Sequence, residues 1–291
     1  SFRYIQNLWK GGLFFLYPTT LFNRDIYMYN AKTLSKALIM LIACLSNSVS
    51  MSGQDHKHKH DAVASKYVYQ QKFIPRQTLE IDLSKTAVFI TDPQNDFISE
   101  GGAGWPLVGE GVVAGKVVKR LVQLRNAAKR VGIPVFYSTH MYTKKDYDNW
   151  TSLNGIDKIM FENNLFIQGT WGHDFHPDLK PDDNTVVLNP HKGLSNFWTG
   201  DAALQLRQYG VTTLIMTGMV ANMCVESHAR DAIENGFDVI IVADATAAAG
   251  EDALKAAHIN YEFLAHEVVT TDEIIKRLHK VKVAQQTKAD Q

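Results

Sequence analysis

Cysteine is scarce in this chain: only Cys44 and Cys224 occur among its 291 residues. A small fold held together by several disulfides is therefore excluded. One cysteine lies in an apolar run near the beginning of the sequence and the other follows a strand-like segment, so we expect no disulfide between them. Each cysteine needs its own explanation.

Net charge is also absent, because 30 basic residues balance 30 acidic residues. The whole-chain field gives no electrostatic reason to expect nucleic acid or an anionic membrane as a partner. Hydrophobic residues make up 45% and charged residues 21% of the chain, which excludes a disordered, collagen-like or coiled-coil protein. We therefore expect a globular protein that acts on a small-molecule substrate.

The apolar run from Ala37 to Leu45 is too short to span a bilayer. It follows Met28, Lys32 and Lys36 and is itself followed by small polar residues up to Ser50. This order is typical of a secretory signal peptide, which we place at 28–50. The sequence thus predicts an exported protein, periplasmic or secreted. A buried helix in a cytoplasmic protein is the alternative.

Two kinds of cleavage stay open for this signal. Cleavage after Ser50 would use the small residues Ser48 and Ser50, whereas Leu41 to Cys44 resembles a bacterial lipobox, whose cysteine becomes lipidated. Lipidation at Cys44 would be the only reason to expect membrane attachment. We interpret residues 1–27, which precede the first plausible start, as an upstream segment with no structural role.

Histidines and lysines alternate within the next segment, 51–84, at His56, His58 and His60. Such a tract can bind a transition metal weakly, but the interleaved lysines repel a cation. We expect a solvated linker here. Metal binding by the tract remains the alternative.

Strand and helix patterns alternate from residue 85 to about residue 280, and no internal repeat is present. Continuous apolar strands alternating with amphipathic helices predict an α/β domain with one doubly wound parallel sheet, Rossmann-like, covered by helices on both faces. Residues 281–291 are expected to form a tail. The predicted strands are 86–92, 134–140, 185–190, 212–218, 238–244 and 266–269, and the predicted helices are 112–132, 199–209, 222–236 and 250–260.

Three chemically capable side chains follow strands of this predicted sheet: Asp92, Lys192 and Cys224. Ligands of doubly wound sheets bind beyond the carboxyl ends of the strands, so these three are expected to meet. A helix N-terminus and a nearby ammonium would favour the thiolate of Cys224, and a carboxylate could accept its proton. Alone, each has an ordinary interpretation as a turn cap, a solvated lysine or a core thiol; the combination favours a catalytic triad.

Three segments carry a family resemblance. TDPQNDF (91–97), HKGLSNFWTGDAALQLRQYGV (191–211) and TGMVANMCVESHARDAIENGFDVIIVADAT (217–246) resemble, in this order, the aspartate, lysine and nucleophile blocks of the isochorismatase-like cysteine hydrolases. That superfamily also includes nicotinamidases, carbamoylsarcosine amidases and ureidoacrylate amidohydrolases. The resemblance implies a hydrolase of the isochorismatase-like fold and, by analogy alone, a homo-oligomer, either a dimer or a tetramer.

The resemblance also implies roles for individual residues. Asp92 would be the general base and Cys224 the nucleophile that forms a covalent acyl-enzyme intermediate, while Lys192 would hold Asp92 and the thiolate together. The backbone N–H groups of Ala221 and Cys224 would form the oxyanion hole, and a cis peptide would join Val220 to Ala221. Residues expected to support these groups or line the pocket are Gln94, Asp96, Phe97, His140, Phe197 and Trp198, with Trp150 and Trp171 as further candidates.

Departures from the resemblance limit the activity. Nicotinamidases carry a metal-binding Asp and histidines after the second strand, but 138–150 contains only His140, and His173 and His176 come much later. We therefore expect no catalytic metal and no cofactor. Isochorismatases proper cleave a vinyl ether without the cysteine, so Cys224 favours hydrolysis of a C–N bond in a small amide or ureido substrate.

Two other functions stay open: isochorismatase-type vinyl ether hydrolysis, and a catalytically silent metal-binding or binding protein. Residues 141–184 are expected to set substrate specificity.

Overall fold

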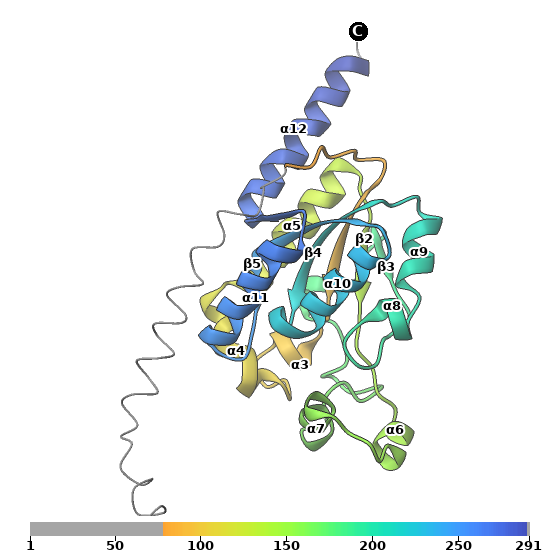
Figure 1. Ribbon diagram of the computed structural model, residues 1–291, viewed down its shortest axis with the longest axis vertical. Coiled ribbons are helices and arrows are strands. Elements are labelled where there is room, and N and C mark those ends of the chain that lie inside the picture. The colour runs from red at the N-terminus through yellow and green to blue at the C-terminus, as the bar shows by residue number, and fades with distance from the viewer. Residues whose placement is uncertain (1–77, 290–291) are drawn as a thin grey trace, which may run out of the picture. The chain divides into compact units, whose positions relative to one another are not determined.

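The computed structural model describes residues 78–289, which contain a six-stranded sheet with helices on both faces (Figure 1). All neighbouring strands are parallel, in the order β3-β2-β1-β4-β5-β6. This confirms the predicted doubly wound α/β fold. The strands are β1 (Thr86–Thr91), β2 (Val135–Ser138), β3 (Thr185–Val187), β4 (Thr213–Met219), β5 (Asp238–Ala247) and β6 (Glu267–Val269).

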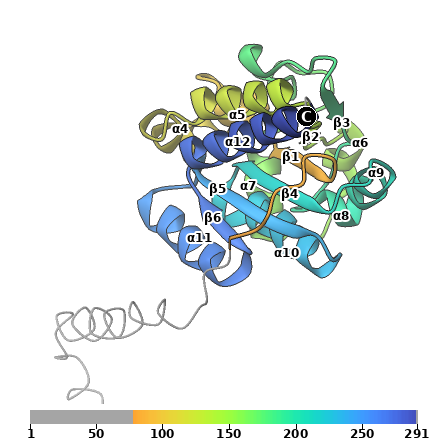
Figure 2. The ribbon, with the colours of Figure 1, turned by 90° about the horizontal axis from the view of Figure 1, so that it is seen from above.

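The two central strands, β1 and β4, are buried along their whole length. They are covered by helices on both faces, which is why their sequences are nearly continuous apolar runs without alternation. One face is covered by α4 (Trp105–Ala114), α5 (Val117–Val131) and α12 (Thr271–Ala289). The other face is covered by α10 (Glu226–Glu234) and α11 (Glu251–Leu264), as Figure 2 shows. The short helix α8 (Asn196–Thr199) packs beside α10, and α9 (Ala202–Gln208) follows α8 in the chain.

The predicted helix 112–132 is in fact two helices. Lys116 adopts a left-handed conformation with φ 51°, so the chain breaks between α4 and α5. α5 then buries one side, including Leu121 and Leu124, and ends at Gly132, whose φ of 85° lets its N–H reach the carbonyl of Ala128.

Both predicted boundaries of the domain need correction. Ile81 and Leu83 belong to the hydrophobic core, and Arg277 binds both Glu267 and the carbonyl of Leu79, so the packed domain begins before residue 85. The expected tail from residue 281 instead continues α12 as far as Ala289. Such edges are set by packing that local composition does not reveal.

The segments 1–27 and 28–50, Cys44 and the tract of His56, His58 and His60 lie outside the described residues. Within 78–289, no helix is long and apolar enough to cross a membrane.

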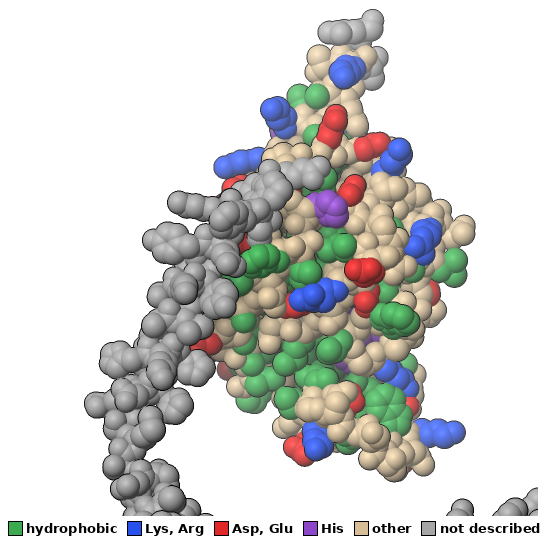
Figure 3. All heavy atoms as spheres, in the orientation of Figure 1, with side chains coloured by type: hydrophobic (Ala, Val, Ile, Leu, Met, Phe, Trp, Pro, Cys, Tyr) green, Lys and Arg blue, Asp and Glu red, His purple; other side chains and the backbone are tan. Residues whose placement is uncertain are grey.

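The chain makes its longest excursion beyond the carboxyl ends of the strands. Short helices α3 (Asn95–Ile98), α6 (Lys144–Asn149) and α7 (Gly155–Glu162) lie there, at the bottom of Figure 1. Figure 3 shows apolar side chains gathering in the lower half of the visible face, towards this excursion. The segment between β2 and β3 therefore forms the wall of any site at the strand ends.

Candidate active site

Asp92 follows β1 directly and is completely buried. It has φ 48°, and its N–H binds the carbonyl of Ser138 at 2.7 Å, which fixes it between the ends of β1 and β2. Behind it, β4 approaches β1 closely: a Cβ on Gly218 would lie 2.2 Å from the carbonyl oxygen of Thr91. Only glycine fits there, and the close approach brings the end of β4 to Asp92.

Cys224 lies beyond β4, in the π-helical turn η3 (Ala221–Val225) that leads into α10. Its thiol is buried, and the charge of Asp92 acts on it. Burial and then the charge of Asp92 raise the pKa of the thiol well above its ordinary value. The expectation that the surroundings of Cys224 favour a thiolate is therefore wrong: the resting group is a neutral thiol beside a carboxylate.

Lys192 is not part of this cluster. Its ammonium pairs with Asp146 and lies 5.7 Å from the centre of the Trp150 ring. Among residues 78–289 no ion pair joins Lys192 to Asp92. The predicted contact of Lys192 with the catalytic pair is thus corrected.

His191 takes the place next to Asp92 instead. It is fully buried, and its Nε2 lies 3.0 Å from Asp92 Oδ1. The backbone of His191 forms a parallel bridge with His140, whereas Lys192 lies in the bend that follows. His191 thus reaches Asp92, and the side chain of Lys192 turns to Asp146.

His140, expected only to support the pocket, also reaches Asp92, with its Nδ1 3.8 Å from Oδ2. Gln94 fixes the backbone of His140 from both sides, accepting its N–H at 2.7 Å and donating to its carbonyl at 2.9 Å. The ring stacks on Phe166 with centroids 5.0 Å apart, and its Nε2 lies 3.2 Å from the hydroxyl of Tyr142.

The carboxylate and the imidazoles have opposite protonation tendencies. Burial opposes ionisation of Asp92, but the neighbouring His191 and His140 outweigh burial and lower its pKa. Burial and the proximity of His191 lower the pKa of His140, which favours its neutral form. The cluster therefore contains an ionised Asp92 and a neutral His140 near neutral pH.

His228, which the sequence reasoning did not select, fixes the loop that carries the nucleophile. Its Nε2 accepts the N–H of Asn196 at 3.0 Å and lies 2.9 Å from Ser138 Oγ. Nε2 is thus unprotonated, so Nδ1 carries the proton and donates to the carbonyl of Cys224. Burial lowers the pKa of His228 to about 3 and keeps it neutral.

The non-proline cis peptide joins Met219 to Val220, one bond earlier than predicted for Val220 and Ala221. It lies where β4 ends at Met219 and extended Val220 leads into η3. The backbone of Val220 and of Cys224 acts to lower the pKa of the Cys224 thiol, against the larger effects of burial and of Asp92. Ala221 is anchored through its carbonyl, which accepts the hydroxyl of Tyr261 at 2.6 Å.

Asp96 ties the excursion to the strand ends. Its carboxylate accepts the N–H groups of Ala103 at 2.9 Å and Phe166 at 2.6 Å. A Cβ on Gly172 would lie 2.1 Å from Asp96 Oδ1, so only glycine at this position lets the chain pass so close to the carboxylate. Phe97 is buried and packs edge-on against Phe166 at 4.8 Å.

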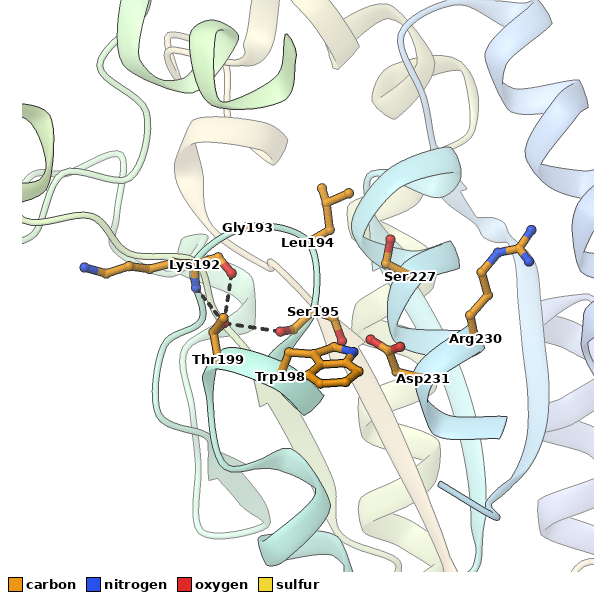
Figure 4. A pocket seen from close by; sticks show the side chains of 9 residues that line it. All are labelled: Lys192, Gly193, Leu194, Ser195, Trp198, Thr199, Ser227, Arg230 and Asp231. Carbon is orange, nitrogen blue, oxygen red and sulfur yellow. Dashed lines mark hydrogen bonds between the residues drawn. The ribbon is translucent and has the colours of Figure 1, made fainter. Parts of the chain in front are cut away.

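The two remaining aromatic candidates, Phe197 and Trp198, lie in different surroundings, one inside the fold and the other at the surface. Phe197 packs against Phe89, Phe237 and His228, inside the fold. Trp198 is 81% exposed and lines a separate surface hollow between α8 and α10 (Figure 4). In that view the side chain of Lys192 points away from the hollow.

The prediction of no catalytic metal did not consider one group of side chains. Ligand atoms of Asp92, His140 and His191 all lie within 4.8 Å of one another, and all three residues are buried. The prediction weighed His140, His173 and His176 against the nicotinamidase pattern and left His191 out. The second histidine instead comes from the segment after β3, which the sheet places beside the end of β2.

A buried thiol and carboxylate beyond the strand ends of a doubly wound sheet define an α/β protein with a cysteine-centred site. The isochorismatase domain matches residues 86–273, more than half of the chain. The protein therefore belongs to the isochorismatase family of hydrolases.

Relatives and solved structures agree with this assignment. The ureidoacrylate amidohydrolase RutB of Methylobacterium radiotolerans is 30% identical over 203 residues, which cover 64% of this chain and 76% of that protein. A cysteine hydrolase from Pseudomonas syringae pv. phaseolicola 1448A has a TM-score of 0.62 at 23% identity, covering 71% of this chain and 98% of its own. An isochorismatase-like hydrolase from Alkaliphilus metalliredigens has a TM-score of 0.53 at 25% identity, covering 68% and 98%.

Proposed function

We propose that this protein hydrolyses a C–N bond in a small amide or ureido substrate, with Cys224 as nucleophile and Asp92 as general base. The observation that carries the proposal is the burial of the Cys224 thiol together with the ionised Asp92, whose charge acts on the thiol. The similarity to ureidoacrylate amidohydrolases supports the bond type. Neither the site nor the similarity to these relatives identifies the particular substrate within this class.

In the proposed reaction, Asp92 accepts the thiol proton as Sγ bonds to the substrate carbonyl carbon. The C–N bond then breaks and the proton passes from Asp92 to the departing nitrogen, which leaves a thioester on Cys224. Water attacks the thioester, again losing a proton to Asp92, and the acid product leaves as the proton returns to sulfur. Developing negative charge on the carbonyl oxygen would be stabilised by backbone N–H groups of η3, among which we retain Ala221 and Cys224 as proposed donors.

We assign the third role to His191 instead of Lys192. His191 holds Asp92 through Oδ1, and Oδ2 has no hydrogen-bond partner among the described residues, which leaves it to receive a proton. The pairing of Lys192 with Asp146 supports a role in fixing the excursion around α6.

The proposal is tested by measuring ammonia release from a panel of carbamoyl, ureido and primary amide compounds. The wild type, Cys224→Ala and Asp92→Asn are compared, and rapid-quench intact mass spectrometry seeks an acyl adduct. We expect ammonia release and an adduct on wild type only. Retained ammonia release in Cys224→Ala would contradict the nucleophilic role of Cys224.

We further propose export of the protein, supported by the signal-like composition of residues 28–50. N-terminal sequencing of the natural product tests this: a mature chain starting at 44 or 51 supports export, and one retaining residues 28–50 contradicts it.

A further inference from the structure

Three metal-binding side chains meet at the floor of the site. Asp92 follows β1, His140 follows β2 and His191 follows β3, so three separate strand ends each deliver one ligand. His191 Nε2 lies 3.0 Å from Asp92 Oδ1, and His140 Nδ1 lies 3.8 Å from Asp92 Oδ2. All three side chains are fully buried, unlike the acidic clusters that are common on surfaces.

Three atoms of this cluster are left without partners: Asp92 Oδ2, His140 Nδ1 and His191 Nδ1 are buried and form no hydrogen bond with the described part of the chain. Of these, Asp92 Oδ2 and His140 Nδ1 lie 3.8 Å apart. Buried polar atoms are nearly always satisfied, and an orphan one needs an explanation such as an ion. A cation placed between these two atoms would satisfy both.

We propose that Asp92, His140 and His191 bind one divalent transition-metal ion of the Zn²⁺ class. Imidazole nitrogen and carboxylate oxygen lie about 2.0–2.2 Å from such an ion, so adjacent ligand atoms of a tetrahedral site are separated by roughly 3.3 Å. The observed separations of 3.0 and 3.8 Å lie on either side of this value. Two imidazoles disfavour Mg²⁺ and Ca²⁺, which prefer oxygen ligands.

The surroundings support this ligand set. The hydroxyl of Tyr142 lies 3.2 Å from His140 Nε2, so it can fix the ring with Nδ1 directed at Asp92. Gln94 holds the His140 backbone, and Phe166 stacks on its ring.

The proposed metal site shares Asp92 and His191 with the proposed hydrolysis, but Cys224 is not one of the three ligands. The cluster can be either hydrogen-bonded, with His191 donating to Asp92, or metal-bound, but not both at once. His191 Nε2 carries a proton when it donates to Asp92, and it must lose that proton to bind the ion. Cys224→Ala therefore separates the two ideas, since it removes the nucleophile and leaves the metal ligands in place.

The test uses the full chain with His56, His58 and His60 replaced by alanine, so that the tract contributes no metal binding. After chelator treatment and dialysis, Zn²⁺ is titrated by calorimetry and Co²⁺ by its visible absorption. We expect one ion per chain, with affinity reduced at least tenfold in His140→Gln and in His191→Gln. His173→Gln is the matched control and should bind like the parent, as should Cys224→Ala.

The proposal is overturned by the absence of saturable binding, or by equal affinity of the parent and both ligand variants. It is also overturned if one ion per chain binds only when the tract histidines are present. Circular dichroism and thermal unfolding establish that each variant is folded. Should one ligand variant fail to fold, the other decides the result.

Discussion

Replacing Asp92 by asparagine should make the thiol of Cys224 more reactive, although it abolishes the proposed catalysis. The thiol pKa is raised by burial and by the charge of Asp92, and Asp92→Asn removes the charge while leaving a side chain of similar size. Two unit charges about 4 Å apart interact by about 4 kcal/mol at an effective dielectric constant of 20. At about 1.36 kcal/mol per pKa unit, the thiol pKa should fall by on the order of 2–3 units.

The corresponding change in alkylation rate can be worked out. A thiolate loses nucleophilicity as its pKa falls, with a Brønsted coefficient of about 0.4–0.5, so a fall of 2–3 units accelerates the reaction by roughly 10- to 60-fold. The assay is the rate of iodoacetamide labelling at pH 7.5, with chelator present, followed by mass spectrometry of the peptide that contains Cys224. The thiol is buried in both the wild type and Asp92→Asn, so the effect of limited reagent access largely cancels in the ratio of the two labelling rates.

Asp146→Asn is the matched control, because it removes a carboxylate that pairs with Lys192. Its labelling rate should equal that of the wild type. Unchanged or slower labelling of Asp92→Asn, in a protein with an unaltered circular dichroism spectrum, would refute the electrostatic reasoning. So would a wild-type thiol that titrates below pH 7.

Three further predictions concern stability and are measured by urea unfolding. Gly172→Ala forces a Cβ against Asp96 and should lower the free energy of unfolding by about 1–3 kcal/mol; no change would mean that the loop yields easily. Asp96→Ala leaves the N–H groups of Ala103 and Phe166 unpaired, with an expected loss of about 2–5 kcal/mol, and a loss below about 0.5 kcal/mol would contradict this. Because the folded pKa of His228 lies at about 3, below its unfolded value, stability should fall as pH drops from about 6.5 towards 3. This slope should flatten in His228→Gln; an identical slope would assign it to other groups.

The fold and the meeting of Asp92 with Cys224 could be predicted from the sequence for a simple reason. Buried parallel strands are continuous apolar runs, and their carboxyl ends converge, so Asp92 and Cys224 could be placed together without coordinates. The split at Lys116 was missed because a left-handed residue leaves no interruption in the apolar pattern.

The residue that pairs with Asp92 differs from the predicted one by a single position. His191 forms a bridge with His140 at the sheet edge, and Lys192 begins the bend that follows. The sequence cannot show which of the two points inward. The approach of His140 to His191 was also hidden, because it depends on how the segments after β2 and β3 align across the sheet.

The most direct test of the central claim compares His191→Gln with Lys192→Met in hydrolysis of the best amide or ureido substrate found. If Cys224 and Asp92 work with His191, kcat/KM should fall at least 100-fold in His191→Gln, whereas Lys192→Met should stay within about threefold of the wild type, a difference of less than about 1 kcal/mol in activation free energy. Loss of activity in Lys192→Met with near-normal activity in His191→Gln would contradict the account and restore Lys192 to the triad.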